Sequence, residues 1–305
     1  ADQYPACHPI LASLPKLTIH SWLTALQTER LEQKAQLITQ RLALCNRNWE
    51  DAFFITLARN FGFGLNGDAF ETWAGLLPFR AMDKHRNDLF QIEAFFYGLA
   101  GLLEETFLKK EQEDEYSLRL CKEFRYLQRK FEIGQGMDAT LWRFLRLRPE
   151  NFPHIRLAQL AYLYQKGDKL FSRLLEAETL ADVRTLLDAR TSPYWENHYL
   201  FGRLSSQKEK AMGERSKDLI IINTVVPFLY TYGLHKADER MFERAGRFLE
   251  ELKAESNHII RSWSDAGLAV VSAADSQALI QLQKEYCDKR KCLYCRFGYE
   301  YLKHT

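Results

Sequence analysis

The chain has 305 residues, of which 46% are hydrophobic, and this is enough to bury a large core in one big domain or two packed ones. Its 42 Lys and Arg residues nearly balance its 40 Asp and Glu residues, so no strong net charge draws the whole chain to nucleic acid or to a membrane. The longest apolar stretches, 95–103 and 219–234, are shorter than the roughly 20 residues that cross a bilayer. We expect a soluble protein without a membrane span, in which any basic surface is local.

The cysteines and the first residues predict a cytoplasmic location. Six cysteines are spread unevenly over a long chain, and no Asn-x-Ser/Thr acceptor for glycosylation occurs. The chain starts with ADQYPACHPI, which lacks the basic start and apolar run of a secretory signal. Reduced thiols are therefore favoured over a disulfide framework. Since the first residue is not Met, we also expect the chain to be part of a longer protein.

Apolar residues at helical spacing predict helices throughout the first half of the chain. They lie at 17–45, 49–61, 70–77, 87–105 and 112–133. Asn48 stands where its side chain caps the second of these helices. The segment 87–105 is apolar nearly all round, so it should be the most buried helix, with Phe96 fully enclosed. Gly98 and Gly101 would let a neighbouring backbone approach it closely.

A possible boundary follows at Gly134 to Asp138, and the pattern then changes. Residues 142–148 alternate with period two, which favours an extended segment. Further helices are predicted at 154–165, 169–175, 180–188, 217–232, 236–263 and 272–286. Pro227 should kink or restart one of them, and Ser272 with Asp275 resembles a capping box that opens the last.

These elements predict an all-α fold with little or no sheet. No alternation of strands and helices appears, so a parallel sheet is not expected. We predict an array of roughly ten helices in two packed lobes. The lobes would be an N-terminal one at 1–136 and a C-terminal one at 137–305, with a Cys-rich end.

Five long motifs give the chain a family resemblance. They are NFGFGLNGDAFETWA, QIEAFFYGLAGLL, WRFLRLRPENFPHIRLAQLA, INTVVPFLYTYG and YCDKRKCLYCRFG. In this order they resemble a bacterial family known as domain of unknown function 2851, along essentially the whole chain. Members of that family look longer at the N-terminus, where a preceding segment is similar to nuclease folds of the restriction-endonuclease type. The resemblance thus implies the helical C-terminal portion of a nuclease-like protein, and it carries over no catalytic residue.

Gly62, Gly64 and Gly67 form the pattern G-x-G-x-x-G. In a dinucleotide site this pattern follows a strand and opens a helix, but here a predicted helix precedes it. We therefore interpret it as a helix end and a tight turn, and we expect no dinucleotide cofactor.

Several arginines lie among aromatic residues, a composition typical of surfaces that bind phosphates and stack on bases. The candidate nucleic-acid-binding residues are Trp142, Arg143, Arg146, Arg148 and Arg156. The alternative is structural, because Glu93 lies in an apolar helix and a buried carboxylate needs a partner. In that interpretation Arg146 and Arg148 form a buried ion pair with Glu93. A third possibility is that Glu93 is an acid with a raised pKa in a cleft.

Cys287, Cys292 and Cys295 follow the spacing C-x4-C-x2-C, which lets three thiolates converge on one metal. A fourth ligand is missing locally, and we expect Cys7 to supply it. The site would hold zinc or an iron–sulfur cluster. The alternative is that a helix ends near Cys287 and another begins near Cys292, with the thiols packed as small hydrophobic groups.

No local motif assigns a catalytic residue, since neither H-E-x-x-H nor G-x-S-x-G occurs. We therefore expect a helical accessory domain of a larger nuclease-like protein, in contact with nucleic acid or with an N-terminal nuclease-like domain. The alternative is a helical protein-interaction scaffold without catalytic activity.

Overall fold

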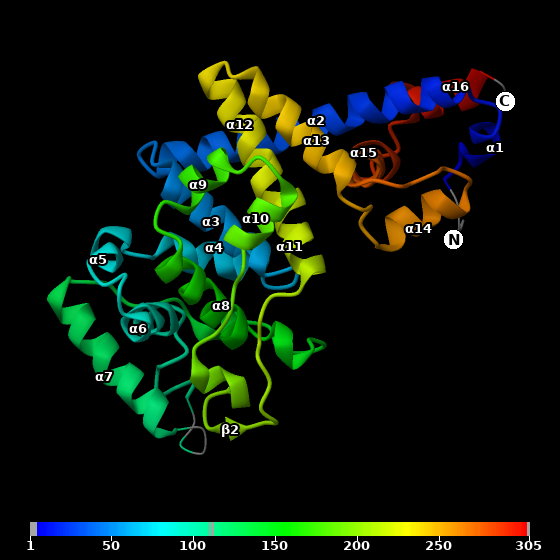
Figure 1. Ribbon diagram of the computed structural model, residues 1–305. Helices are drawn as coiled ribbons and strands as arrows, with labels where there is room; N and C mark the ends of the chain where they lie inside the picture. Colours follow the sequence, from blue (N-terminus) through cyan, green and yellow to red (C-terminus); the bar gives the residue numbers. More distant parts are fainter. Residues whose placement is uncertain (1–4, 109, 111–112, 304–305) are drawn as a thin grey trace. The chain divides into compact units, whose positions relative to one another are not determined.

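The protein is seen here in a computed structural model that describes residues 5–108, 110 and 113–303 (Figure 1). Helices dominate, and the sheet among the described residues has two short strands. The predicted all-α fold is confirmed. Several predicted helices are divided into shorter ones, so the helices are more numerous than expected. No helix in the described part of the chain is long and apolar enough to span a membrane.

The chain forms two compact units, here called unit 1 (residues 1–43 and 225–305) and unit 2 (residues 44–224). Unit 1 is therefore built from both ends of the sequence. Its helices are α1 (His8–Leu11), α2 (Lys16–Leu44), α12 (Val226–Lys236), α13 (Glu239–Glu251), α14 (His258–Asp265), α15 (Ala273–Leu282) and α16 (Arg296–Lys303). A π-helical segment at Gln283–Cys287 and a 3₁₀ turn at Cys292–Tyr294 lie between α15 and α16.

Unit 2 contains the remaining helices and both strands. Its helices are α3 (Trp49–Phe61), α4 (Gly67–Gly75), α5 (Phe79–Asp83), α6 (Leu89–Leu99), α7 (Glu115–Lys130), α8 (Pro153–Lys166), α9 (Leu170–Glu176), α10 (Leu180–Leu186) and α11 (Glu214–Ile220). Strands β1 (His198–Leu200) and β2 (Arg203–Leu204) pair antiparallel, with His198 opposite Leu204. The boundary expected between residues 136 and 137 falls inside this unit.

Local capping explains where several helices begin. The Asn48 side chain accepts hydrogen bonds from two backbone amides at the start of α3, as predicted. Ser272 and Asp275 form a capping box at the start of α15, also as predicted. Pro227 lies in the first turn of α12, directly after a π-helical segment at Ile221–Val225 that continues α11, so the chain stays helical up to and beyond the proline.

In unit 2, helix α6 packs against both α7 and α8 (Figure 1). Every residue from Ile92 to Leu99 is buried, and Phe96 is fully enclosed as predicted. Helices α8 and α15 bury at least as large a share of their residues, however, so α6 is not the most buried helix. The helix is shorter than expected because Gly101 adopts a left-handed conformation (φ +71°). A segment further along the chain packs against this end of α6, and there Met137 N donates a hydrogen bond to Leu99 O at 2.9 Å. A Cβ at Gly98 would collide with the Phe124 ring of α7.

The single helix predicted at 236–263 is divided in two. Helix α13 ends at Glu251, and Lys253 forms a bridge with Ser272, while Asn257 caps the start of α14. The side-chain oxygen of Asn257 accepts from Ile260 N at 3.0 Å, so the new helix has its own start signal. The division allows α15 to pack against both α13 and α14.

Candidate functional site

The glycine-rich segment between α3 and α4 is a tight turn, as the sequence predicted. A Cβ at Gly62 would collide with the backbone of Gly67, and Gly64 has a φ of +93°. The turn holds another segment in place, because the Asn66 side chain accepts from Arg143 N at 2.8 Å and donates to Arg143 O at 2.9 Å.

Residues 142–148 contain neither helix nor strand, so the segment is only partly extended. It turns at Arg146, whose φ is +65°. Trp142 is buried and donates from Nε1 to Ala100 O at 2.8 Å, which fixes one end of the segment. Arg143, Arg146 and Arg148 are exposed. This segment, defined by these three arginines and held by Asn66 and Trp142, is called the arginine loop below.

Two of the five nucleic-acid candidates therefore lie in the interior. Besides Trp142, Arg156 is buried, and its guanidinium group donates to Asn151 Oδ1 at 2.5 Å and to Gln159 Oε1 at 2.9 Å. It also lies 4.4 Å from the centre of the Phe63 ring. Burial lowers the pKa of Arg156 to about 10. Assigning Arg156 and Trp142 to a phosphate-binding surface was wrong, because both side chains are enclosed and already hold the fold together.

Aromatic side chains line a small pocket of about 220 Å³ that includes a residue of the arginine loop. The lining residues are Phe107, Leu108, Phe144, Phe152, His154, Leu200 and Phe201. Phe144 lies nearly parallel to Phe107, with 6.3 Å between ring centres, and meets the edge of Phe152 at 5.4 Å. All three of these phenylalanines are half-buried, so part of each ring faces the pocket or solvent. The sequence interpretation missed Phe107, since it lies far from Phe144 in the chain.

Glu93 is fully buried in α6, but its partners are hydroxyl groups. The Tyr116 hydroxyl donates to Glu93 Oε2, and the Ser192 hydroxyl lies 3.3 Å from that of Tyr116. Burial raises the pKa of Glu93 to about 7, against the lowering effect of hydrogen bonds from Tyr116, Ser192 and Trp195. Trp195 lies close enough to lower the pKa of Glu93. Its Nε1 and Glu93 Oε1 nevertheless form no well-aligned hydrogen bond among the described residues.

The expected ion pair of Glu93 with Arg146 and Arg148 is corrected by this arrangement. Both arginines are exposed on the arginine loop, and the ion pairs found among the described residues do not include Glu93. The raised pKa reduces the need for a cationic partner, because the carboxyl is mostly protonated and neutral at pH values below about 7. The sequence could not indicate Tyr116 or Ser192 as partners, since hydroxyl-bearing residues are common and carry no spacing signal.

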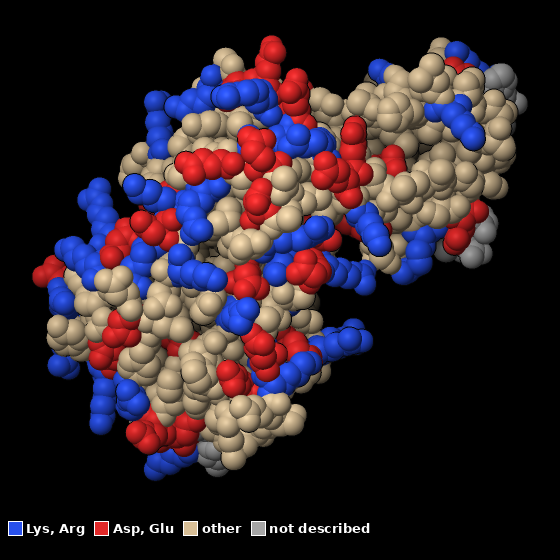
Figure 2. All heavy atoms as spheres, viewed as in Figure 1, with Lys and Arg blue, Asp and Glu red and all other residues tan. Residues whose placement is uncertain are grey.

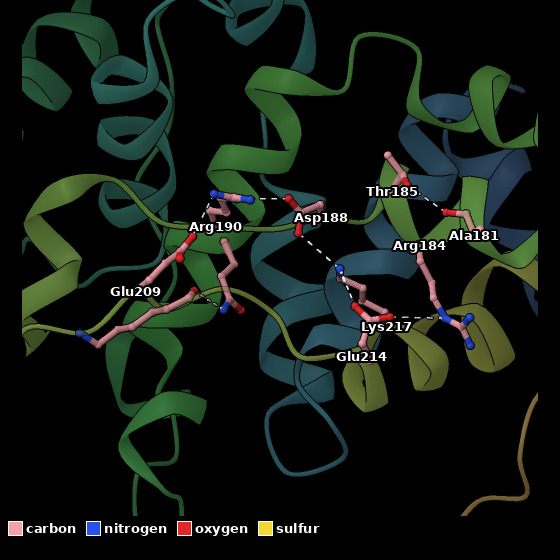
Figure 3. Close-up of polar contacts among 10 residues, drawn as sticks. Ala181, Arg184, Thr185, Asp188, Arg190, Glu209, Glu214 and Lys217 are labelled. Carbon is pink, nitrogen blue, oxygen red and sulfur yellow. Dashed lines mark hydrogen bonds and ion pairs between the residues drawn. The ribbon is translucent and has the colours of Figure 1, made fainter.

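Charged side chains are intermixed on the face of the molecule drawn in Figure 2, as the balanced composition suggests. A connected group of them joins α10, α11 and the loop at 188–213 (Figure 3). Asp188 accepts from Arg190 at 3.2 Å and from Lys217 at 3.3 Å, and Lys217 also pairs with Glu214 at 2.9 Å. Because each of these charges is paired with an opposite one, we interpret the group as structural: its ion pairs connect the loop to α11.

In unit 1 the structure brings Cys7, Cys287, Cys292 and Cys295 to the lining of one cavity of about 560 Å³. All four are free thiols. Burial, with a smaller effect of the neighbouring thiols, raises the pKa of Cys7 to about 11 and that of Cys287 to about 12. Among the described residues, however, no three His, Cys, Asp or Glu side chains are arranged to hold a single metal ion.

A glycine that the sequence interpretation missed positions these cysteines. A Cβ at Gly298, in α16, would collide with the backbone of Cys292. Its amide also donates to Cys295 Sγ at 3.5 Å. Gly298 therefore lets the 3₁₀ turn at Cys292–Tyr294 pack directly against α16.

The fold and these sites define a helix-dominated protein of two compact units, with an aromatic pocket in one and a thiol-lined cavity in the other. The chain belongs to the family described as "Protein of unknown function (DUF2851)", whose model matches residues 1–258. The matched range contains Cys7, Glu93 and the arginine loop, and it ends before Cys287. No curated protein and no solved structure matches the chain.

Proposed function

We propose that this chain is a helical domain that contacts single-stranded nucleic acid through the arginine loop. The supporting observation is that Arg143, Arg146 and Arg148 are exposed beside a pocket lined by the half-buried rings of Phe107, Phe144 and Phe152. Guanidinium groups bind phosphates, while aromatic rings stack on bases of any sequence. The two groups together supply the contacts that a flexible strand requires.

The backbone of the loop is held before any ligand binds. Asn66 forms two hydrogen bonds with Arg143, and the Trp142 indole is anchored to Ala100 O. A fixed backbone reduces the conformational entropy lost on binding, so the exposed arginines contribute more of their interaction to affinity. This supports a binding role for the loop over a role as an unstructured connection.

The test is a fluorescence-anisotropy titration of labelled single-stranded DNA and RNA oligonucleotides at several salt concentrations. Three phosphate contacts give a slope of log K against log salt of about −2, at about −0.7 for each phosphate. The triple variant R143A/R146A/R148A should reduce both the affinity and the slope. The matched control is K122A/R129A/R173A, which removes three exposed positive charges from helices α7 and α9.

Equal losses in the two triple variants would mean that only net charge matters, and they would contradict a specific site. Absence of binding at low salt would also contradict the proposal. Binding of a protein with little salt dependence, and its loss in the Phe144→Ala variant, would instead support an interaction scaffold. That second candidate is favoured by the pocket itself, whose lining residues are almost all apolar.

We further propose that the chain works in the cytoplasm as part of a longer protein with an N-terminal nuclease-like domain. The six free thiols favour a reducing compartment. The complete open reading frame provides the test. A reading frame without a nuclease-like segment would contradict this part of the proposal and leave the oligonucleotide titration unaffected.

A further inference from the structure

The thiol-lined cavity of unit 1 has an unusual composition for a hydrophobic core. Each of its four cysteines lies at or next to the end of a helical element: Cys7 before α1, Cys287 at the end of the π-helical segment, Cys292 at the start of the 3₁₀ turn, and Cys295 before α16. Helices α1 and α16 pack against each other, so helices that are far apart in the sequence both contribute to this region (Figure 1).

The rest of the lining is poor in alternative ligands. Trp263, Tyr286 and Tyr301 contribute rings, and Arg290 contributes a positive charge, but no carboxylate or imidazole appears among the described residues that line the cavity. A set of sulfur donors alone selects zinc, copper(I) or iron–sulfur clusters over oxygen-binding cations. On the face drawn in Figure 2, few charged side chains lie over α1, α14 and α16.

The spacing of the thiols separates these possibilities. One zinc ion draws its four sulfur ligands to about 2.3 Å from a single point. The four thiols share one cavity, yet no three His, Cys, Asp or Glu side chains among the described residues are arranged around a single ion. A cluster places its cysteine ligands further apart, because each thiolate binds a different iron atom.

We propose that Cys7, Cys287, Cys292 and Cys295 ligate a four-iron, four-sulfide cluster, with one thiolate on each iron. Each thiol releases its proton to solvent as it binds iron, and Arg290 offsets part of the negative charge that results. The Gly298 amide already donates to Cys295 Sγ, and hydrogen bonds of this kind to cluster sulfurs adjust the reduction potential. The proposal concerns unit 1 alone and does not depend on nucleic-acid binding by unit 2.

The experiment is anaerobic purification of the full chain, followed by reconstitution with sulfide and equal amounts of ferrous and ferric iron, which together supply the two ferrous and two ferric ions of the oxidised cluster. Iron and acid-labile sulfide should each reach about four per chain, with a brown colour that bleaches on reduction. The single variants C7S, C287S, C292S and C295S should each lower iron and sulfide several-fold. The matched controls are C45S and C121S, which change the two cysteines of unit 2 and should leave the iron content unchanged.

Two further measurements separate ligation from loss of folding. Far-UV circular dichroism of each variant checks its helix content. Alkylation of the unaltered chain, read by mass spectrometry, should modify the four cluster cysteines more slowly after reconstitution, with no change at Cys45 or Cys121. The Gly298→Ala variant keeps every thiol but displaces the turn at Cys292, and it should also lose most of the iron.

Stoichiometric zinc without iron would overturn the cluster and indicate a single-ion site. Absence of both metals after anaerobic reconstitution would overturn the site as a whole. Retention of the full iron content by C7S would exclude Cys7 as the fourth ligand.

Discussion

Unit 2 encloses Glu93 among the hydroxyl groups of Tyr116 and Ser192, whereas unit 1 gathers four thiols around a cavity. Both regions bury groups that can carry charge. In unit 2 one oxygen of the carboxyl accepts from Tyr116, and aromatic rings pack around the group. In unit 1 the thiols face open volume and one another. The comparison indicates that a buried polar group with protein partners has a structural role. A buried polar group beside unfilled space is the better candidate for binding a ligand.

Replacement of Phe96 by Ala should have the largest effect, because it opens a void in the closed core of unit 2. The Phe96 ring meets Trp73 edge to face at 4.7 Å between ring centres and is fully buried. Loss of such a ring costs about 3–5 kcal/mol in the free energy of unfolding. Chemical denaturation measures this cost, and a loss below about 1 kcal/mol would break the contrast between a filled core and an open cavity.

The Glu93→Gln variant sharpens the comparison through pH. Burial raises the pKa of Glu93 from 4.5 to about 7, so the folded protein holds a proton that the unfolded chain releases between these values. This carboxyl therefore lowers the stability of the native protein progressively as pH rises from about 4.5 to about 7. The effect totals roughly 3 kcal/mol and is constant above that range.

The Glu93→Gln variant should lack this decrease, since the amide does not titrate but its oxygen can still accept from Tyr116. Denaturation of both proteins at pH 5 and pH 7.5 gives the comparison. The variant should gain stability relative to the native protein at the higher pH. An identical pH dependence in the two proteins would mean that Glu93 ionises normally, against the structural account of its site.

Replacement of Cys295 by Ala in metal-free protein should have the smallest effect. The thiol lines a cavity that already exists, so its removal enlarges a space and opens no new one. We expect a loss of about 1 kcal/mol or less in the free energy of unfolding. A loss of several kcal/mol, measured by the same denaturation, would mean that the thiols are packed as ordinary core groups.

The sequence by itself determined the helix-dominated class and the features that depend on neighbours in the chain. The long helix α2, the Asn48 cap and the Ser272 capping box all follow from residues within one or two turns of each other. Local hydrogen bonds and side-chain periodicity act over such short separations, so a linear pattern contains the information.

Only the tertiary structure decided which distant residues meet. Glu93 meets Tyr116 and not Arg146, Arg156 lies inside and not on the surface, and Phe107 joins Phe144 around a pocket. Cys7 reaches the same cavity as Cys295 because α1 packs beside α16. These contacts join residues on different elements, so they depend on how whole helices pack against one another. A buried carboxyl has several possible partners of similar energy, so its sequence neighbours do not select one.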